Sequence, residues 1–469
     1  MVFSSLVMIY VFLPIVLLLY FLSPNRLKNL ILLVSGLLFY AWGEPVYIWV
    51  MIVSSTVDYM AGLIINKYDD NPKIRKLALI ISMIVDLGFL VVFKYSGFFV
   101  SNINNLFGAN IPIPDLPLPI GISFYTFQSM SYTIDLYWRN IKVQKNFLDY
   151  LTYVSLFPQL VAGPIVKYED VQNEIHERKV NIKLVGEGTN LFIKGLAKKV
   201  LLANNIGALW TEIKTLDFTQ ISVVTAWIGI LSFTFQIYYD FSGYSDMAIG
   251  LGKMLGFNFP KNFDHPYISK SVSEFWRRWH ITMGSWFRDY IYIPLGGNRN
   301  GKLKLIRNTF IVWALTGFWH GAGWNFIVWG LFYGVLLMIE KMFLGKVLEK
   351  LPSIIRMLYT FVLVVIGWVF FDTSTLTEAG QLLKAMFGVG NNFIDSYAKY
   401  QVASYIVIFI ACIVCGTNIR EKITTLLTNK DNTAKIYYYS LPILQLAIML
   451  VCTAYLVDAT YNPFLYFRF

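Results

Sequence analysis

Long apolar runs without a charged side chain recur along the whole chain. One of them, residues 311–339, contains 29 residues and no Asp, Glu, Lys or Arg. A helix needs about 20 apolar residues to cross a bilayer, so a run of this length is typical of a membrane-embedded segment. The runs do not alternate between apolar and polar residues, which argues against a β-barrel.

Composition supports the same fold class. Of the 469 residues, 56% are hydrophobic and 14% are charged, against about 25% charged in an ordinary soluble domain. A soluble globule of this size cannot remove that much apolar surface from water. These values exclude a cytosolic enzyme, a disordered chain and a secreted disulfide scaffold. We therefore predict an all-α polytopic membrane protein.

The runs predict roughly 11–14 transmembrane and re-entrant helices, which we expect to form one domain over residues 1–469. Residues 148–166 contain two prolines and a glycine, so this segment should be broken or re-entrant. Residues 311–339 are too long for one straight crossing, and we expect the break at residues 321–323. The last three spans are expected at residues 357–371, 402–416 and 437–458.

Charge distribution predicts the orientation. The 39 Lys and Arg residues exceed the 28 acidic residues by 11, and basic loops favour the cytoplasmic side of a membrane. The basic segments 23–28 and 66–76 should therefore lie inside, with the N-terminus and residues 101–115 outside. We also expect residues 256–304 at the cytoplasmic face. No basic run is interleaved with aromatics on a soluble segment, so we do not expect nucleic-acid binding.

The three cysteines do not indicate a redox or metal site. Cys412, Cys415 and Cys452 all lie in apolar segments, and the single C-x-x-C has no second pair. Metal sites built on this motif need further ligands. We expect three small apolar side chains and no metal.

His320 is the most informative of the four histidines. It is the tenth residue of the uncharged run 311–339 and is bracketed by Trp319 and Trp324, with Asn325 close by. An ionisable group inside a membrane segment is costly and is a functional hypothesis by default. The alternative is a histidine that is hydrogen-bonded to a neighbouring helix.

His280 is the second candidate. On a continuous helix it would share one face with Arg277 and Gly284. The surrounding Trp and Arg residues also fit an amphipathic helix at the cytoplasmic interface, which explains the tryptophans better than the histidine. Arg277 and Arg278 would steer an anionic ligand. His176 and His265 are expected to be loop residues.

Asp240 lies in a polar stretch within a long apolar segment. Residues 238–246 read Tyr-Tyr-Asp-Phe-Ser-Gly-Tyr-Ser-Asp, the kind of glycine-interrupted patch found where backbone lines a cavity. Asp240 is therefore a candidate substrate-binding residue. Ion transport would also use such carboxylates.

These motifs together resemble the membrane-bound O-acyltransferase (MBOAT) family, and more narrowly its bacterial alginate O-acetyltransferase-like branch. The resemblance runs along nearly the whole chain. The residues that carry it are 277–299, 317–330, 119–125, 157–164, 240–246 and 461–469.

The resemblance implies a helical bundle with a central funnel or tunnel and no bound cofactor. It implies that His320 is catalytic and that His280 occupies the family's second polar position. Trp319 and Asn325, which are close to His320 in the sequence, are candidate substrate-binding residues. We expect His320 to act as general base on an acceptor hydroxyl or to help form an acyl intermediate. We expect His280 to orient or polarise the carbonyl of a cytoplasmic thioester donor such as acetyl-CoA.

The resemblance also implies a setting. The protein should lie in the bacterial cytoplasmic membrane and work with an extracytoplasmic SGNH-type acetyltransferase that O-acetylates a cell-surface polysaccharide. D-alanyl transfer toward teichoic acid is the alternative within the family. A transporter or flippase of acyl or lipid-linked groups, and a non-catalytic scaffold, are alternatives outside it.

Overall fold

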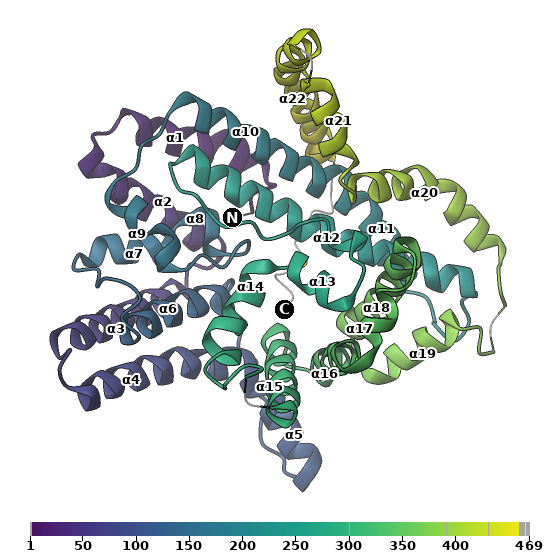
Figure 1. Ribbon diagram of the computed structural model, residues 1–469, viewed down its shortest axis with the longest axis horizontal. Coiled ribbons are helices and arrows are strands. Elements are labelled where there is room, and N and C mark those ends of the chain that lie inside the picture. The colour runs from purple at the N-terminus through teal and green to yellow at the C-terminus, as the bar shows by residue number, and fades with distance from the viewer. Residues whose placement is uncertain (1, 300, 391, 430, 459–464, 466–469) are drawn as a thin grey trace. The chain divides into compact units, whose positions relative to one another are not determined.

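The computed structural model describes residues 2–299, 301–390, 392–429, 431–458 and 465. Throughout this described part the secondary structure is helical, without strands (Figure 1). The predicted fold class is therefore confirmed. Of the motif at residues 461–469, only Leu465 lies within the described residues.

The helices follow one another with short connections. In chain order they are η1 (Met8–Phe12), α1 (Leu13–Leu22), α2 (Asn25–Gly43), α3 (Ile48–Lys67), α4 (Pro72–Leu90), η2 (Val91–Tyr95), α5 (Ser96–Phe107), α6 (Ile122–Tyr137), α7 (Phe147–Ser155), α8 (Phe157–Leu160), α9 (Tyr168–His176), α10 (Ile182–Ala197), η3 (Lys198–Ala203), α11 (Asn204–Ile213), α12 (Val223–Met254), η4 (Pro266–Ile268), α13 (Val272–Arg278), α14 (Ile281–Phe287), η5 (Arg288–Tyr292), α15 (Lys302–His320), α16 (Trp324–Ile339), η6 (Glu340–Leu344), α17 (Gly345–Leu348), α18 (Ser353–Asp372), α19 (Leu376–Met386), α20 (Ser396–Cys415), α21 (Ile419–Thr428) and α22 (Asp431–Asp458).

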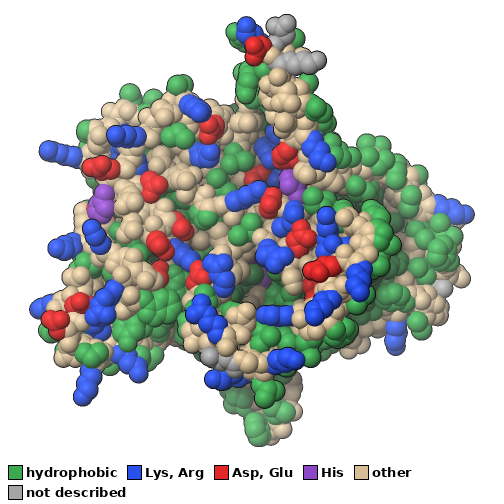
Figure 2. Space-filling view, viewed as in Figure 1, with side chains coloured by type: hydrophobic (Ala, Val, Ile, Leu, Met, Phe, Trp, Pro, Cys, Tyr) green, Lys and Arg blue, Asp and Glu red, His purple; other side chains and the backbone are tan. Residues whose placement is uncertain are grey.

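Six helical stretches among the described residues are long and apolar enough to cross a membrane. They are Ile48–Lys67, Pro72–Phe107, Trp324–Leu348, Ser353–Asp372, Ser396–Cys415 and Thr433–Asp458. Figure 2 shows hydrophobic side chains gathered over α20, where Tyr400, Val407 and Ile410 are exposed. Apolar surface of this extent suits contact with lipid. The chain is thus a multi-pass membrane protein.

Both predicted breaks are present. The segment 148–166 forms α7 and the single-turn α8, followed by irregular backbone. The run 311–339 is divided between α15 and α16, with residues 321–323 outside both. The last three spans correspond to α18, α20 and α22, each a few residues longer than predicted.

The chain folds into two compact units. Unit 1 comprises Met1–Phe192, Ser245–Lys261 and Ser285–Ile291, and unit 2 comprises Ile193–Tyr244, Asn262–Gly284 and Tyr292–Phe469. The chain passes from one unit to the other within α10, α12 and α14. A compact unit is not by itself an independent domain, so the single domain stays a prediction.

In unit 1, helices α3 and α4 pack side by side and both contact α6 (Figure 1). Two reciprocal hydrogen bonds join the pair. The hydroxyl of Ser82 donates to Asp58 at 2.6 Å, and the hydroxyl of Ser54 donates to Asp86 at 2.6 Å. All four side chains are buried. Hydrogen bonds of this kind hold apolar helices together where the hydrophobic effect offers little.

The N-out orientation can be tested at the two ends of the continuous stretch Pro72–Phe107. Single cysteines at Asp70 and Asn110, both exposed, in a background without the three native cysteines, should be labelled from opposite sides by an impermeant maleimide. The Asp70 position should react from the cytoplasmic side. These positions leave the α4 cap at Asn71 and the Asn104–Ile111 hydrogen bonds intact. Labelling of both from one side would overturn the orientation.

Unit 2 is centred on aromatic side chains. Trp329 and Tyr333 of α16 and Trp368 of α18 are at most 1% exposed. The rings of Tyr333 and Trp368 lie 5.4 and 6.3 Å from that of Trp329, between centroids. Helix α15 packs closely against α16, and α16 packs against α18. This arrangement brings the end of α15, which carries His320, into the buried part of the unit.

Candidate active site

His320 is the last residue of α15 and is 3% exposed. Its ring lies 5.0 Å from Trp319, 5.0 Å from Trp329 and 5.2 Å from Phe371, measured between ring centroids. Each of these ring pairs is nearly perpendicular, at 74–84°. An imidazole held among aromatic rings is shielded from water and kept in one orientation.

The position of His320 depends on close contact between two helix backbones. A Cβ on Gly317 would lie 2.2 Å from the carbonyl oxygen of Phe326, and a Cβ on Gly330 would lie 2.2 Å from that of Trp313. Only glycine permits this approach. Gly321 and Gly323 then carry the chain from α15 to α16 in extended conformation.

Replacing Gly317 by alanine should therefore separate α15 from α16. We expect a loss of about 1–3 kcal/mol or more in stability from overpacking, together with reduced activity because His320 is one turn away. Gly380 of α19 is the matched control, since an added Cβ there meets nothing within 4 Å. Gly380→Ala should leave thermal stability unchanged or raise it. Equal melting temperatures for the two variants would contradict this packing.

His280 lies between α13 and α14, with φ at +44°. The predicted continuous helix over this segment is wrong. The helix ends at Arg278 and restarts at Ile281, so Arg277, His280 and Gly284 do not share a face. His280 is fully buried and Trp279 is 2% exposed, so these two side chains do not form an exposed amphipathic face, and the location of the segment at the cytoplasmic interface stays a prediction.

Helix α13 is anchored at its N-terminus by two carboxylates. Glu340 accepts hydrogen bonds from the backbone N–H groups of Val272 and Ser273 at 2.7 and 3.0 Å. The hydroxyl of Ser271 accepts from the N–H of Glu274, and Glu274 accepts from the N–H of Lys270. These contacts satisfy N–H groups that have no partner within the helix. They hold α13 in place, and with it the position of His280, two residues after the helix ends.

One aromatic ring lies next to both histidines. The ring of Trp319 is 5.0 Å from that of His320 and 6.2 Å from that of His280. The ring of Phe241 also packs against His280, at 4.7 Å. The two candidate catalytic residues, 40 positions apart in the sequence, therefore meet around Trp319 within unit 2.

His280 is neutral in this environment. Burial lowers the pKa of its imidazole to about 3, because an apolar surrounding disfavours the charged form. Its Nδ1 lies 3.1 Å from Oδ1 of Asn262. A neutral imidazole has one nitrogen that donates a hydrogen bond and one that accepts.

Asp240 is tied to the chain through both carboxylate oxygens. Oδ1 lies 2.5 Å from the ammonium of Lys199, and Oδ2 accepts the backbone N–H of Leu465 at 2.8 Å. Asp240 and Lys199 are each 2% exposed, so removal of the Lys199 charge would leave a buried carboxylate without its cation, which is costly. Asp240 thus has a structural role, and its contact with substrate stays a prediction.

The remaining predicted site residues differ in their surroundings. Arg277 is exposed, as a residue that steers anions should be. Arg278 forms an ion pair with Glu274 at 2.7 Å. Asn325 donates to the carbonyl of Thr373 at 2.9 Å, joining the start of α16 to the end of α18.

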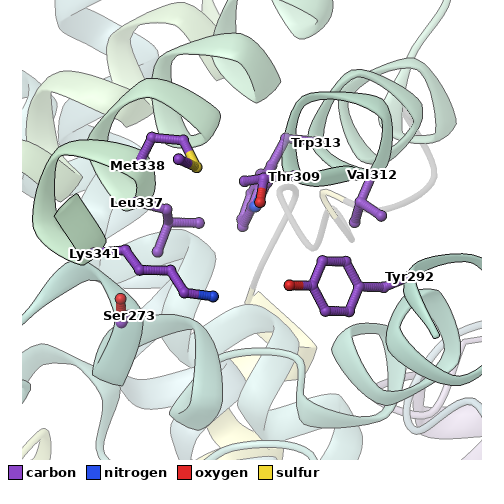
Figure 3. A pocket seen from close by; sticks show the side chains of 8 residues that line it. All are labelled: Ser273, Tyr292, Thr309, Val312, Trp313, Leu337, Met338 and Lys341. Carbon is purple, nitrogen blue, oxygen red and sulfur yellow. The ribbon is translucent and has the colours of Figure 1, made fainter. Parts of the chain in front are cut away.

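A cavity of about 200 Å³ is lined in part by Trp313. In Figure 3 the ammonium of Lys341 and the hydroxyl of Tyr292 both point into it, and Leu337 and Met338 form an apolar wall. The ring of Trp313 lies 6.3 Å from that of Trp329, which contacts His320. Within the described residues, no three His, Cys, Asp or Glu side chains gather as a metal-binding group.

Comparison with known proteins identifies the family. The model of the membrane-bound O-acyltransferase family matches residues 139–371, which include both histidines. The probable alginate O-acetylase AlgI of Pseudomonas putida is 37% identical over the full length of both chains. The chain belongs to the MBOAT family. It is therefore an O-acyltransferase.

Two further relatives match over most of the chain. The probable alginate O-acetylase AlgI of Pseudomonas aeruginosa is 41% identical over 83% of this chain and 75% of its own length. A peptidoglycan O-acetyltransferase of Helicobacter pylori is 35% identical over 83% of this chain and 80% of its own length. The predicted family and enzyme class are confirmed.

Sequence reasoning missed four residues that shape the two units. Asn262, Lys199 and Glu340 act on partners 18, 41 and 68 positions away, beyond the range of any local pattern. Asp58 of α3 had a usable signal, because Ser-x-x-Val-Asp occurs twice, at residues 54–58 and 82–86.

Proposed function

We propose that this MBOAT protein transfers an acetyl group from a cytoplasmic thioester donor toward a cell-surface polysaccharide. The observation that carries the proposal is the placement of His320 and His280 next to the same ring, Trp319, inside the segment that matches the family. The relatives named for O-acetylation of alginate and peptidoglycan support acetyl as the group and a surface polymer as its destination.

The chemistry is the transfer of an acyl group from sulfur to oxygen. A hydroxyl attacks the thioester carbonyl, the carbon–sulfur bond breaks, and the hydroxyl proton ends on the released thiolate. His320 acts as the base that takes this proton and returns it to sulfur. A neutral imidazole can take the proton, and the imidazolium so formed can return it, near pH 7. Exclusion of water by the surrounding rings protects the thioester from hydrolysis.

Acetyl-CoA is the donor we propose, bound from the cytoplasmic side. The cavity beside Trp313 offers an ammonium, a phenol and an apolar wall, a combination that suits a chain carrying phosphate at one end. Exposed Arg277 adds positive charge that would attract it. We place the protein in the bacterial cytoplasmic membrane, with an extracytoplasmic SGNH-type acetyltransferase as the partner that completes the modification.

The proposal can be tested in vesicles that contain the purified full chain. Acetyl-CoA is supplied on the cytoplasmic side, and alginate or peptidoglycan oligosaccharides, with or without a purified SGNH-type acetyltransferase, on the other. We expect release of CoA thiol and the appearance of acetyl esters on the acceptor. Thiol release without any ester would contradict transfer. If a D-alanyl thioester were transferred at the same rate as the acetyl group of acetyl-CoA, the proposal that acetyl is the transferred group would be contradicted.

A further inference from the structure

Asn262 is a buried asparagine, 1% exposed, in the connection between α12 and α13. Its side-chain oxygen lies 3.1 Å from Nδ1 of His280. The same oxygen accepts hydrogen bonds from the backbone N–H and the hydroxyl of Thr282, at 3.3 and 3.0 Å. Its backbone carbonyl accepts the N–H of Ile281 at 2.9 Å. Asn262 thus contacts the turn that carries His280 at four points.

These contacts determine which atoms face the imidazole. A backbone N–H can only donate, so the Asn262 atom that meets the N–H of Thr282 must be oxygen and not the amide nitrogen. The amide oxygen of Asn262 only accepts hydrogen bonds, so the ring nitrogen of His280 that faces it has to be the donor. Nδ1 of His280 must therefore carry the proton, and in the neutral ring Nε2 then holds the lone pair.

The same contacts support an unfavourable backbone conformation. His280 adopts φ of +44°, and the left-handed region costs a residue with a Cβ about 1–2 kcal/mol. The hydrogen bond from Ile281 to Asn262 and that from the N–H of Asp264 to the carbonyl of Arg278, at 2.9 Å, hold the turn on both sides. Strain of this kind persists only where the surroundings over-determine it.

We propose that Asn262 is a positioning residue that fixes His280 as the Nδ1–H tautomer, so that Nε2 accepts a hydrogen bond from the attacking hydroxyl. The inference rests on the proposed function. It gives His280 a role other than polarising the thioester carbonyl, which would need a proton on Nε2. The attacking hydroxyl has a single proton. In the bound state the hydroxyl donates this proton as a hydrogen bond to Nε2 of His280, which orients it, and it turns the proton to His320, which removes it, as the attack on the thioester carbonyl begins.

The tautomer can be measured without substrate. Solid-state NMR of the full chain in lipid bilayers, labelled with ¹⁵N-histidine, reports which ring nitrogen carries the proton. The protein has four histidines, and the spectrum of His280→Gly identifies the His280 signals by their loss. We expect a protonated Nδ1 in the native protein and a mixed or inverted state in Asn262→Ala.

Kinetics then test whether the tautomer matters. Asn262→Ala should lower kcat for acetyl transfer from acetyl-CoA by roughly 10–100-fold, as for loss of one buried orienting hydrogen bond, with the donor KM changed by less than about threefold. Asn262→Asp keeps the acceptor oxygen and should recover a large part of kcat. Asn308→Ala is the matched control, because Asn308 is equally buried but its amide donates to the carbonyls of Leu295 and Gly297. It should keep the tautomer.

The two readouts separate the possible failures. A proton on Nε2 in the native protein overturns the inference, whatever the activity. An unchanged kcat in Asn262→Ala with an altered tautomer also overturns it, because the tautomer would then be irrelevant to transfer. Absence of acetyl transfer in the native protein, with the expected tautomer, would count against the proposed function and not against the role of Asn262.

Discussion

Replacing His320 by alanine should abolish acyl transfer in a protein that still folds. Loss of a general base costs about 10²–10⁴-fold, and more if the same residue returns the proton to sulfur. His320 ends α15, and its ring packs among Trp319, Trp329 and Phe371. The smaller side chain leaves α15 and these rings in place, so the fold should tolerate it.

The measurement is release of CoA thiol, normalised to the folded fraction from size-exclusion chromatography. The matched control is His176→Ala, since His176 is an exposed histidine at the end of α9 and its loss should leave turnover unchanged. Turnover near the native rate in folded His320→Ala would refute the role of His320 as base.

Replacing His280 by glycine should impair activity and cost less stability than replacing it by alanine. Glycine adopts the φ of +44° found at this position at no steric cost, whereas alanine keeps the strain of about 1 kcal/mol or more. We therefore expect His280→Gly to melt at or above the temperature of His280→Ala, with both variants impaired by roughly 10²-fold or more in transfer.

The pair of histidines should also behave as one unit. If both act on the same hydroxyl around Trp319, the double variant His280→Gly/His320→Ala should lose little more activity than His320→Ala alone, because effects of residues that act together are not additive. Multiplicative losses would mean that the two histidines act independently and that the shared site is wrong.

Segment lengths and breaks could be read from the sequence because they depend on local physics. The break at residues 321–323 followed from a run too long for one crossing and from its two glycines, and α15 and α16 end and begin there. The segment 148–166 is interrupted for a similar reason: α7 ends at Ser155, Pro158 lies in the first turn of α8, and Pro164 lies in the irregular backbone that follows. In both cases the break could be predicted from the length of the run and from its glycine or proline residues.

The turn at His280 could not be read in this way. The residues around it have good helix-forming spacing, and nothing local marks a left-handed residue. The turn is held by hydrogen bonds to Asn262, 18 positions earlier, and from Asp264. A helix prediction fails here because tertiary hydrogen bonds override propensity, and such local conflicts concentrate at functional sites.

For Asp240 the sequence indicated a functional residue, whereas the structure shows that its carboxylate is bound by other parts of the chain. A carboxylate in an apolar segment is a sound functional candidate, but its charge is matched by Lys199 and its second oxygen by the N–H of Leu465. The sequence could not reveal either partner, because they lie 41 and 225 positions away. The two histidines were found because their surroundings in the sequence, and the family resemblance, pointed to the same residues.

The most direct test of the account is a structure of the full chain bound to a non-hydrolysable acetyl-CoA analogue. The account predicts that the acyl carbonyl lies beside Trp319 and within reach of His320, with space for the attacking hydroxyl between the carbonyl and Nε2 of His280. It also predicts that the phosphate-bearing part of the analogue approaches Lys341 or Arg277. An acyl group bound elsewhere, or separated from His320 by the ring of Trp329, would contradict it.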